Sequence, residues 1–357
     1  MATTATPGGL GLTVITVDPL DEQAARLVAD RDGTVHIPHL GVIVRAPGLS
    51  TEDVEFLDDF VLREPDTVSP ADAVGLIATV DVDAYEEPAW TYCVRVFADL
   101  RVDTRDGETL SFRYGDNPAV PNRNTSRGPE LLAYLALKAN RAATFAEIRD
   151  HLWWGKPISN RTVEPLITGT RRLLGGTTYL SHAEGRPSPR RYELGPTVLA
   201  DVDLLAQALH YTRAAVFTAP DLAVAVLQPH LAALQSPAFR DDHPGAGLAE
   251  WAAANRIFDQ IEQPVIEAAL LYASVHEAQG PDGLNEALWA LDQALKACPT
   301  NEALIRAAME LEVRTGDRAG AQHRYVALAT ELARDDLEPE PETTELHKRI
   351  TTHQRIG

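Results

Sequence analysis

The chain has 357 residues, of which 45% are hydrophobic and 24% are charged, and its formal net charge is −20. This composition is typical of a folded globular protein and excludes a disordered chain, a collagen-like repeat and a disulfide miniprotein. The length predicts two or three domains. The apolar runs are far shorter than the ~20 residues that span a bilayer, and Met1 is not followed by the basic and apolar regions of a signal peptide, so we expect a cytoplasmic protein without a membrane partner.

Charge is distributed unevenly along the sequence. Residues 1–89 carry 4 basic and 17 acidic side chains, residues 90–196 carry 16 and 11, and residues 197–357 carry 12 and 24. The corresponding net charges are −13, +5 and −12. The total charge taken alone argues against a nucleic-acid partner, but residues 90–196 form a basic island between acidic flanks.

The first predicted elements are two strands and one acidic helix. Residues 12–17 and 35–44 have the pattern of strands, and residues 50–62 have that of a helix. Several prolines follow the helix and indicate a boundary. We therefore predict a small acidic α/β domain over residues 1–89.

The basic island begins with strand signals. Residues 92–102 alternate in part between apolar and polar side chains. Residues 105–108 read as a hairpin turn that leads into a second strand over residues 109–114. The polar stretch 115–127 predicts a surface loop.

Three helices and a β-hairpin are predicted next. The helices are expected over residues 129–139, 144–154 and 160–174, and the hairpin strands over residues 178–182 and 191–194. Thr144 and Glu147 have the spacing of a capping box at the start of the second helix, and Gly175 ends the third. Strands followed by three helices and a hairpin predict a winged-helix DNA-binding domain over residues 90–196.

After residue 196 the strand signals end and helices rich in Ala and Leu continue. Residues 283–297 align with residues 317–331 at a spacing of 34 residues, which is the tetratricopeptide period. We predict an all-α tetratricopeptide-like domain over residues 197–357. The fold class is thus an α+β N-terminal part with a winged helix-turn-helix, followed by an all-α tetratricopeptide-like helical repeat domain.

Basic and polar side chains are predicted to gather on the third helix and the hairpin of the winged helix. The fixed fork of donors of arginine suits phosphates and guanine edges, whereas a plain solvated basic face is the alternative interpretation. The predicted DNA-contacting set comprises Arg127, Lys156, Asn160, Arg161, Thr168, Arg171, Arg172, Arg186, Arg190 and Arg191.

No motif predicts catalysis or metal binding. His36 and His39 are three residues apart on a predicted strand, so they point to opposite faces and do not form a metal site. Phosphate-binding glycine loops, nucleophile elbows and zinc-helix motifs are missing from the sequence. Cys93 and Cys298 read as buried thiols. We therefore predict neither an enzyme nor a cofactor.

Two further patterns read as structural. Asp201 and Asp203 stand at a predicted helix N-terminus, where carboxylates interact favourably with the helix dipole. Trp153, Trp154 and Trp251 read as packing residues, although indole rings also stack on bases.

The order of these parts resembles the bacterial transcriptional activator domain family, the antibiotic-regulatory (SARP-like) type of actinobacterial regulator, over about residues 93–352. The resemblance is carried by segments 127–137 (RGPELLAYLAL), 152–153 (LW), 162–163 (TV), 171–175 (RRLLG), 191–194 (RYEL), 250–251 (EW), 301–304 (NEAL), 315–317 (TGD) and 341–346 (PETTEL), with Met309. It implies that the third helix reads direct DNA repeats as part of a dimer. It also implies that the helical domain contacts the partner copy or RNA polymerase, and that Arg171 and Arg172 keep the family's basic pair.

Two residues depart from the family pattern. Pro165 lies inside the predicted third helix, where it costs about 3 kcal/mol unless the helix starts late or kinks. Gly169 stands where the family usually has a basic residue. The alternative function is therefore a protein-interaction scaffold with a vestigial winged helix, whose repeats bind a peptide or partner. In a third hypothesis, the acidic residues 1–89 cover the basic island until a ligand or partner displaces them.

Overall fold

The computed structural model describes residues 85–113, 126–182, 191–239 and 247–352, together with the backbone of three short strands nearer the N-terminus. The chain divides into two compact units, Met1–Thr79 and Val80–Gly357. The two units are described separately below.

The described part of the first unit is an antiparallel sheet of three short strands. These are β1 (Val28–Ala29), β2 (Thr34–Ile37) and β3 (Val42–Arg45), in the order β1-β2-β3. The single strand predicted over residues 35–44 is thus wrong, because Thr34 pairs with Arg45 and the segment is two strands that run in opposite directions. The strand expected over residues 12–17, the helix over 50–62 and His39 lie outside the described residues.

A second three-stranded sheet opens the described part of the second unit. It consists of β4 (Tyr92–Arg95), β5 (Arg101–Thr104) and β9 (Val198–Ala200) in the order β5-β4-β9. β4 pairs antiparallel with β5 and parallel with β9. The predicted strand over residues 92–102 is therefore also two strands, joined through the buried residues Val96 and Phe97.

The predicted turn after β5 is present, but the strand expected after it is not. Gly107 has a φ of 86°, a left-handed conformation that favours glycine, and its N–H donates to the carbonyl of Thr104 over 3.0 Å. Beyond the turn, Thr109 forms only an isolated bridge with Asp103.

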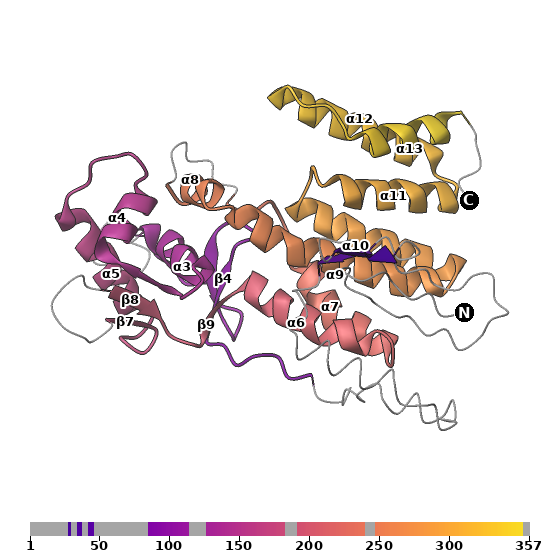
Figure 1. Ribbon diagram of the computed structural model, residues 1–357. Helices are drawn as coiled ribbons and strands as arrows, with labels where there is room; N and C mark the ends of the chain where they lie inside the picture. The colour runs from indigo at the N-terminus through magenta and orange to yellow at the C-terminus, as the bar shows by residue number, and fades with distance from the viewer. Residues whose placement is uncertain are drawn as a thin grey trace, which may run out of the picture. The chain divides into compact units, whose positions relative to one another are not determined.

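The central part of the second unit contains three helices and a third sheet (Figure 1). Its elements are α3 (Gly128–Leu137), β6 (Ala142–Thr144), α4 (Phe145–Leu152), α5 (Asn160–Leu173), β7 (Leu180–His182) and β8 (Arg191–Leu194). The strand order is β6-β8-β7, and both pairings are antiparallel. The three predicted helices and the hairpin strands are confirmed, whereas β6 was not predicted.

Local sequence signals determine where these helices begin and how they pack. Thr144 Oγ1 accepts the N–H of Glu147 over 3.2 Å, and the Glu147 carboxylate accepts the N–H of Thr144 over 2.7 Å, so the predicted capping box is present. Leu131 and Leu135 of α3 and Leu166 of α5 are fully buried. The side chains at this helical spacing therefore face one shared hydrophobic core.

The described residues from 201 to 351 form helices without strands. The helices are α6 (Asp201–Ala215), α7 (Pro220–Ala232), α8 (Gly247–Ala254), α9 (Ile257–Ala278), α10 (Leu284–Ala297), α11 (Glu302–Thr315), α12 (Arg318–Leu332) and α13 (Pro341–Thr351). Two short 3-10 turns, η3 (Pro281–Gly283) and η4 (Ala333–Asp335), lie between them.

Helices α9 to α12 stack in sequence order, each against the next (Figure 1). Ala287 and Leu291 of α10 are buried, and so are Ala321 and Leu328 of α12. A Cβ at Gly283 would collide with the carbonyl of His276, so this glycine allows α9 and the start of α10 to approach closely. None of the described helices combines the length and the hydropathy that crossing a membrane requires.

Candidate nucleic-acid interface

Helix α5 carries the largest group of the predicted DNA-contacting residues. It begins at Asn160, after Ser159 in extended conformation, and its first turn has no acidic residue. The helix continues through Pro165 to Leu173, so it does not start late. Pro165 lacks the N–H that would bond the carbonyl of Arg161, and this carbonyl loses its helical donor.

One face of α5 is exposed, and it holds four of the predicted residues. Asn160, Arg161, Thr168 and Arg172 are all exposed, and Glu164 lies among them. Arg161, Glu164, Thr168 and Arg172 follow one another at spacings of three, four and four residues, which places them along one side of the helix, and Asn160 lies at its N-terminal end. The charged groups of this face are two guanidiniums and one carboxylate.

Two further predicted residues outside this helix are also exposed. Lys156 lies in the turn that precedes α5, and Arg191 begins β8. Arg161, Arg172 and Arg191 form no ion pair with any residue that the structure describes. These three guanidiniums are therefore not neutralised by the described carboxylates.

Arg171 does not lie on the exposed face, which corrects its predicted position. Its Nε donates to the carbonyl of Leu180 over 2.7 Å, and its guanidinium carbon lies 5.9 Å from the centre of the Tyr192 ring. Burial lowers the pKa of Arg171. The side chain connects α5 to β7 and β8 instead of projecting outward.

Arg127 is also placed in an internal contact instead of on a DNA-contacting surface. Its guanidinium pairs with Glu130, donates to the carbonyl of Leu152 over 2.7 Å and lies 4.4 Å over the Trp153 ring. These contacts join the start of α3 to the end of α4. Glu130, three residues further on, is the sequence signal that could have indicated this role.

The remaining predicted positions have different outcomes. Arg186 and Arg190 lie outside the described residues. Gly169 is on the buried side of α5, so a basic residue at this position would not lie on the exposed face. The glycine therefore does not reduce the positive charge of that face. Trp153 and Trp251 are buried as predicted, whereas Trp154, whose ring lies 6.2 Å from that of His151, keeps 40% of its surface exposed.

Tyr92 supports the C-terminal end of α5, a role that the sequence did not indicate. Its hydroxyl donates to the carbonyl of Leu174 over 3.0 Å, and its ring meets the edge of Tyr179 at 5.0 Å. Tyr92 belongs to β4, so the sheet formed by β4, β5 and β9 holds the turn that follows α5.

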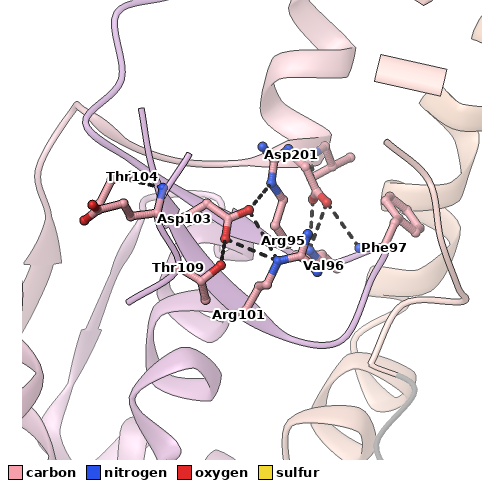
Figure 2. Close-up of polar contacts among 10 residues, drawn as sticks. Arg95, Val96, Phe97, Arg101, Asp103, Thr104, Thr109 and Asp201 are labelled. Atoms are coloured by element: carbon pink, nitrogen blue, oxygen red, sulfur yellow. Dashed lines mark hydrogen bonds and ion pairs between the residues drawn. The ribbon is translucent and has the colours of Figure 1, made fainter. Parts of the chain in front are cut away.

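Asp201 links the same sheet to the first helix of the helical region. Its carboxylate accepts the N–H of Val96 over 3.0 Å and the N–H of Phe97 over 3.2 Å (Figure 2). Burial raises the pKa of Asp201 to about 6. Its predicted place at a helix N-terminus is confirmed, but its main partners are backbone groups 104 and 105 residues away.

A network around Asp103 stabilises the β4–β5 pair. Its carboxylate accepts hydrogen bonds from Arg95 at 2.9 Å, Arg101 at 3.2 Å and Thr109 at 2.7 Å (Figure 2). Burial alone would raise the pKa of Asp103, but the bonds from Thr109 and Arg95 hold it below its usual value. Asp103 is therefore a charged member of this network.

The helical region also contacts the three-helix part through α8. The Trp251 ring meets the edge of the Tyr134 ring at 4.7 Å, and the Tyr134 hydroxyl lies 2.7 Å from His151 Nδ1. A Cβ at Gly247 would collide with the carbonyl of Leu152, at the end of α4. Burial, assisted by Lys138, lowers the pKa of His151, which favours its neutral form in this contact.

Comparison with known proteins identifies part of the chain. Residues 201–351 match the family model described as the bacterial transcriptional activator domain. The match covers less than half of the chain and begins at Asp201, the first residue of α6. No curated protein matches the chain.

One similar solved structure is Mycobacterium tuberculosis EmbR in complex with low affinity phosphopeptide. The sequence identity is 18%, the TM-score is 0.45, and the alignment covers 75% of this chain. The chain spans 66% of the length of that structure.

The described residues contain no group of three or more His, Cys, Asp or Glu side chains that could hold a metal ion. Cys93 and Cys298 are buried free thiols, as predicted. Burial raises the pKa of Cys93 to about 12, so this thiol is not activated as a nucleophile. The exposed groups of the described site are guanidinium, ammonium, hydroxyl and amide groups and the carboxylate of Glu164.

Proposed function

We propose that this protein is a transcription regulator, and not an enzyme, that binds duplex DNA through a winged helix-turn-helix. In this proposal α3, α4 and α5, with the strands β6 to β8, form the winged helix, and α5 enters the major groove. The domain boundaries remain those predicted, 1–89, 90–196 and 197–357. The match of residues 201–351 to the bacterial transcriptional activator domain supports the regulatory role.

The observation that carries the proposal is the exposed face of α5. Arg161 and Arg172 are eleven residues apart, which corresponds to about 16 Å along a helix axis. The major groove is about 12 Å wide, so guanidiniums at the two ends of this face reach the phosphates on its two sides. Glu164 and Thr168 lie between them, at the level of the base edges.

The helical region is proposed to act through protein contacts. Helices α9 to α12 stack each against the next, and we propose that they form tetratricopeptide-like repeats, which present extended surfaces to partners. We propose a second copy of the chain or RNA polymerase as the partner, in line with the activator domain that the region matches.

The test is retention of DNA by the full chain. The purified protein is incubated with a pool of random-sequence duplexes, the retained duplexes are amplified and sequenced, and the affinity of the best sequence is measured at several salt concentrations. If Lys156, Arg161, Arg172 and Arg191 each neutralise one phosphate, the log–log salt slope is about −3.6. A chain that enriches no sequence and shows a slope near zero refutes the proposal.

A scaffold without DNA binding is the second candidate, and one observation favours it. Arg171 is used internally and Glu164 lies on the exposed face, so α5 presents less positive charge than its three arginines indicate. A scaffold would leave all duplexes unbound at physiological salt but would still capture a protein partner through residues 201–351.

A further inference from the structure

Arg171 lies at the junction between α5 and the two strands that lead into the hairpin. Its Nε donates to the carbonyl of Leu180 on β7 over 2.7 Å. Its guanidinium carbon lies 5.9 Å from the centre of the Tyr192 ring, and Tyr192 is a buried residue of β8. One side chain of the helix therefore contacts both strands.

The backbone of Arg171 takes part in the same junction. Its carbonyl accepts the N–H of Gly176 over 2.9 Å, within the turn that leaves α5. Gly176 has a φ of 129°, a conformation that only glycine adopts readily, so this turn requires a glycine at position 176. Backbone and side chain of Arg171 thus fix the turn and the following strand relative to the helix.

Arg172, the next residue, has a different environment. Arg172 is exposed, whereas Arg171 is partly buried. The Arg171 guanidinium turns towards Leu180 and Tyr192, whereas no described contact holds that of Arg172. A phosphate contact needs accessible donors, and Arg172 is the more exposed of the two residues.

We propose that Arg171 is a positioning residue for DNA binding: it holds the β7–β8 hairpin at a fixed distance from α5, while Arg172 makes the phosphate contact. This inference rests on the proposed function, because it assigns roles within that DNA-binding surface. In a winged helix, the helix and the hairpin meet the same duplex at different places. Their relative position therefore determines whether both contacts form together.

The test compares lysine and alanine variants at the two positions in the full chain. Lysine keeps the positive charge but replaces the planar guanidinium by an ammonium on a flexible stem, so it does not reproduce the geometry of the bond to Leu180 together with the contact to the Tyr192 ring. We expect Arg171→Lys and Arg171→Ala to weaken binding of the best-retained duplex alike, by about tenfold, the effect of losing one hydrogen bond to a charged group. We expect Arg172→Lys to bind almost as the unmodified chain does, and Arg172→Ala to lose affinity.

Amide hydrogen exchange provides a second measurement that needs no DNA. In Arg171→Lys the amides of Leu180–His182 and Arg191–Leu194 should exchange faster, while those of α3 and of α9 to α12 keep their rates. In Arg172→Lys, the matched control, none of these rates should change.

The outcomes separate the inference from the proposed function. If the unmodified chain retains no duplex, the proposed function fails, and the role of Arg171 in DNA binding fails with it. If the unmodified chain binds DNA and Arg171→Lys binds equally well, or exchange in the hairpin strands is unchanged, only the positioning role is refuted. Faster exchange throughout the chain in Arg171→Lys also refutes it, because Arg171 would then be a general stabilising residue.

Discussion

Replacing Asp201 by alanine should destabilise the second unit more than replacing it by asparagine. The Asp201 carboxylate is the acceptor for the backbone N–H groups of Val96 and Phe97, two buried residues (Figure 2). A buried donor left without an acceptor costs about 1–3 kcal/mol, so Asp201→Ala, which leaves two of them, should lower the free energy of unfolding by about 2–6 kcal/mol. Asparagine keeps one oxygen as an acceptor, and Asp201→Asn should therefore lose less.

Both variants lack the titrating carboxyl group, so both should differ from the unmodified chain in pH dependence. Burial raises the pKa of Asp201 to about 6 from an ordinary value of 3.8. A carboxyl group whose pKa is higher in the folded state holds its proton more tightly there. Its favourable contribution to the free energy of unfolding is therefore fully present below pH 3.8 and is lost as the pH rises towards 6. The difference of about two pKa units corresponds to about 3 kcal/mol of stability that the unmodified chain loses between about pH 4 and pH 7. Asp201→Asn should not show this loss, so its stability relative to the unmodified chain should rise by about 3 kcal/mol over this range.

Urea unfolding, followed by tryptophan fluorescence at a series of pH values, measures both effects. Asp221→Asn is the matched control, because Asp221 is also in the first turn of a helix, α7, but is exposed. The control should follow the pH profile of the unmodified chain. Parallel profiles for Asp201→Asn and the unmodified chain would refute the reasoning. They would show that the pKa of Asp201 is the same in the folded and the unfolded chain.

Three further variants test other parts of the structure. Thr144→Ala removes the capping box of α4 and should lower the free energy of unfolding, measured in urea, by about 1 kcal/mol. Thr144→Ser keeps the hydroxyl and should not lower it. Equal stabilities of the two variants would show that the cap does not stabilise α4. Trp251→Ala removes the ring contact between α8 and Tyr134 of α3 and should cost about 3–5 kcal/mol, while Trp154→Ala, at a residue 40% exposed, should cost much less. Similar losses of stability in the two variants would contradict this prediction. Arg172→Ala should reduce the salt slope of DNA binding by about 0.9, and Arg256→Ala, an exposed position in the helical region, should leave it unchanged; an unaltered slope in Arg172→Ala would remove its phosphate contact.

The elements determined by local signals could be predicted from the sequence. The capping box of Thr144 and Glu147 depends on groups three residues apart, and the structure confirms it. The core face of α5 follows from apolar residues at helical spacing, and Val163 and Leu166 are buried as that spacing requires. For such features the sequence contains both partners within one or two helical turns.

Features that depend on distant partners could not be predicted. Residues 142–144 give β6 no strand pattern of its own, and it forms because Thr144 pairs with Arg191 of β8. Arg171 was assigned to DNA by its charge, but its acceptor is a backbone carbonyl, and backbone carbonyls carry no sequence signal. The partners of Asp201 are backbone amides as well, and they lie in the connection between β4 and β5, far from Asp201 in the sequence.

The close approach at Gly247 limits how far the two halves of the second unit can be exchanged as modules. No side chain fits between Gly247 and the end of α4, and the Trp251 indole packs against Tyr134 one turn further along α8. A chimera that joins residues 85–194 to an unrelated helical region would therefore meet either a steric collision or an empty hydrophobic surface there. To be grafted successfully, the incoming region must bring both a glycine and an indole to these two places.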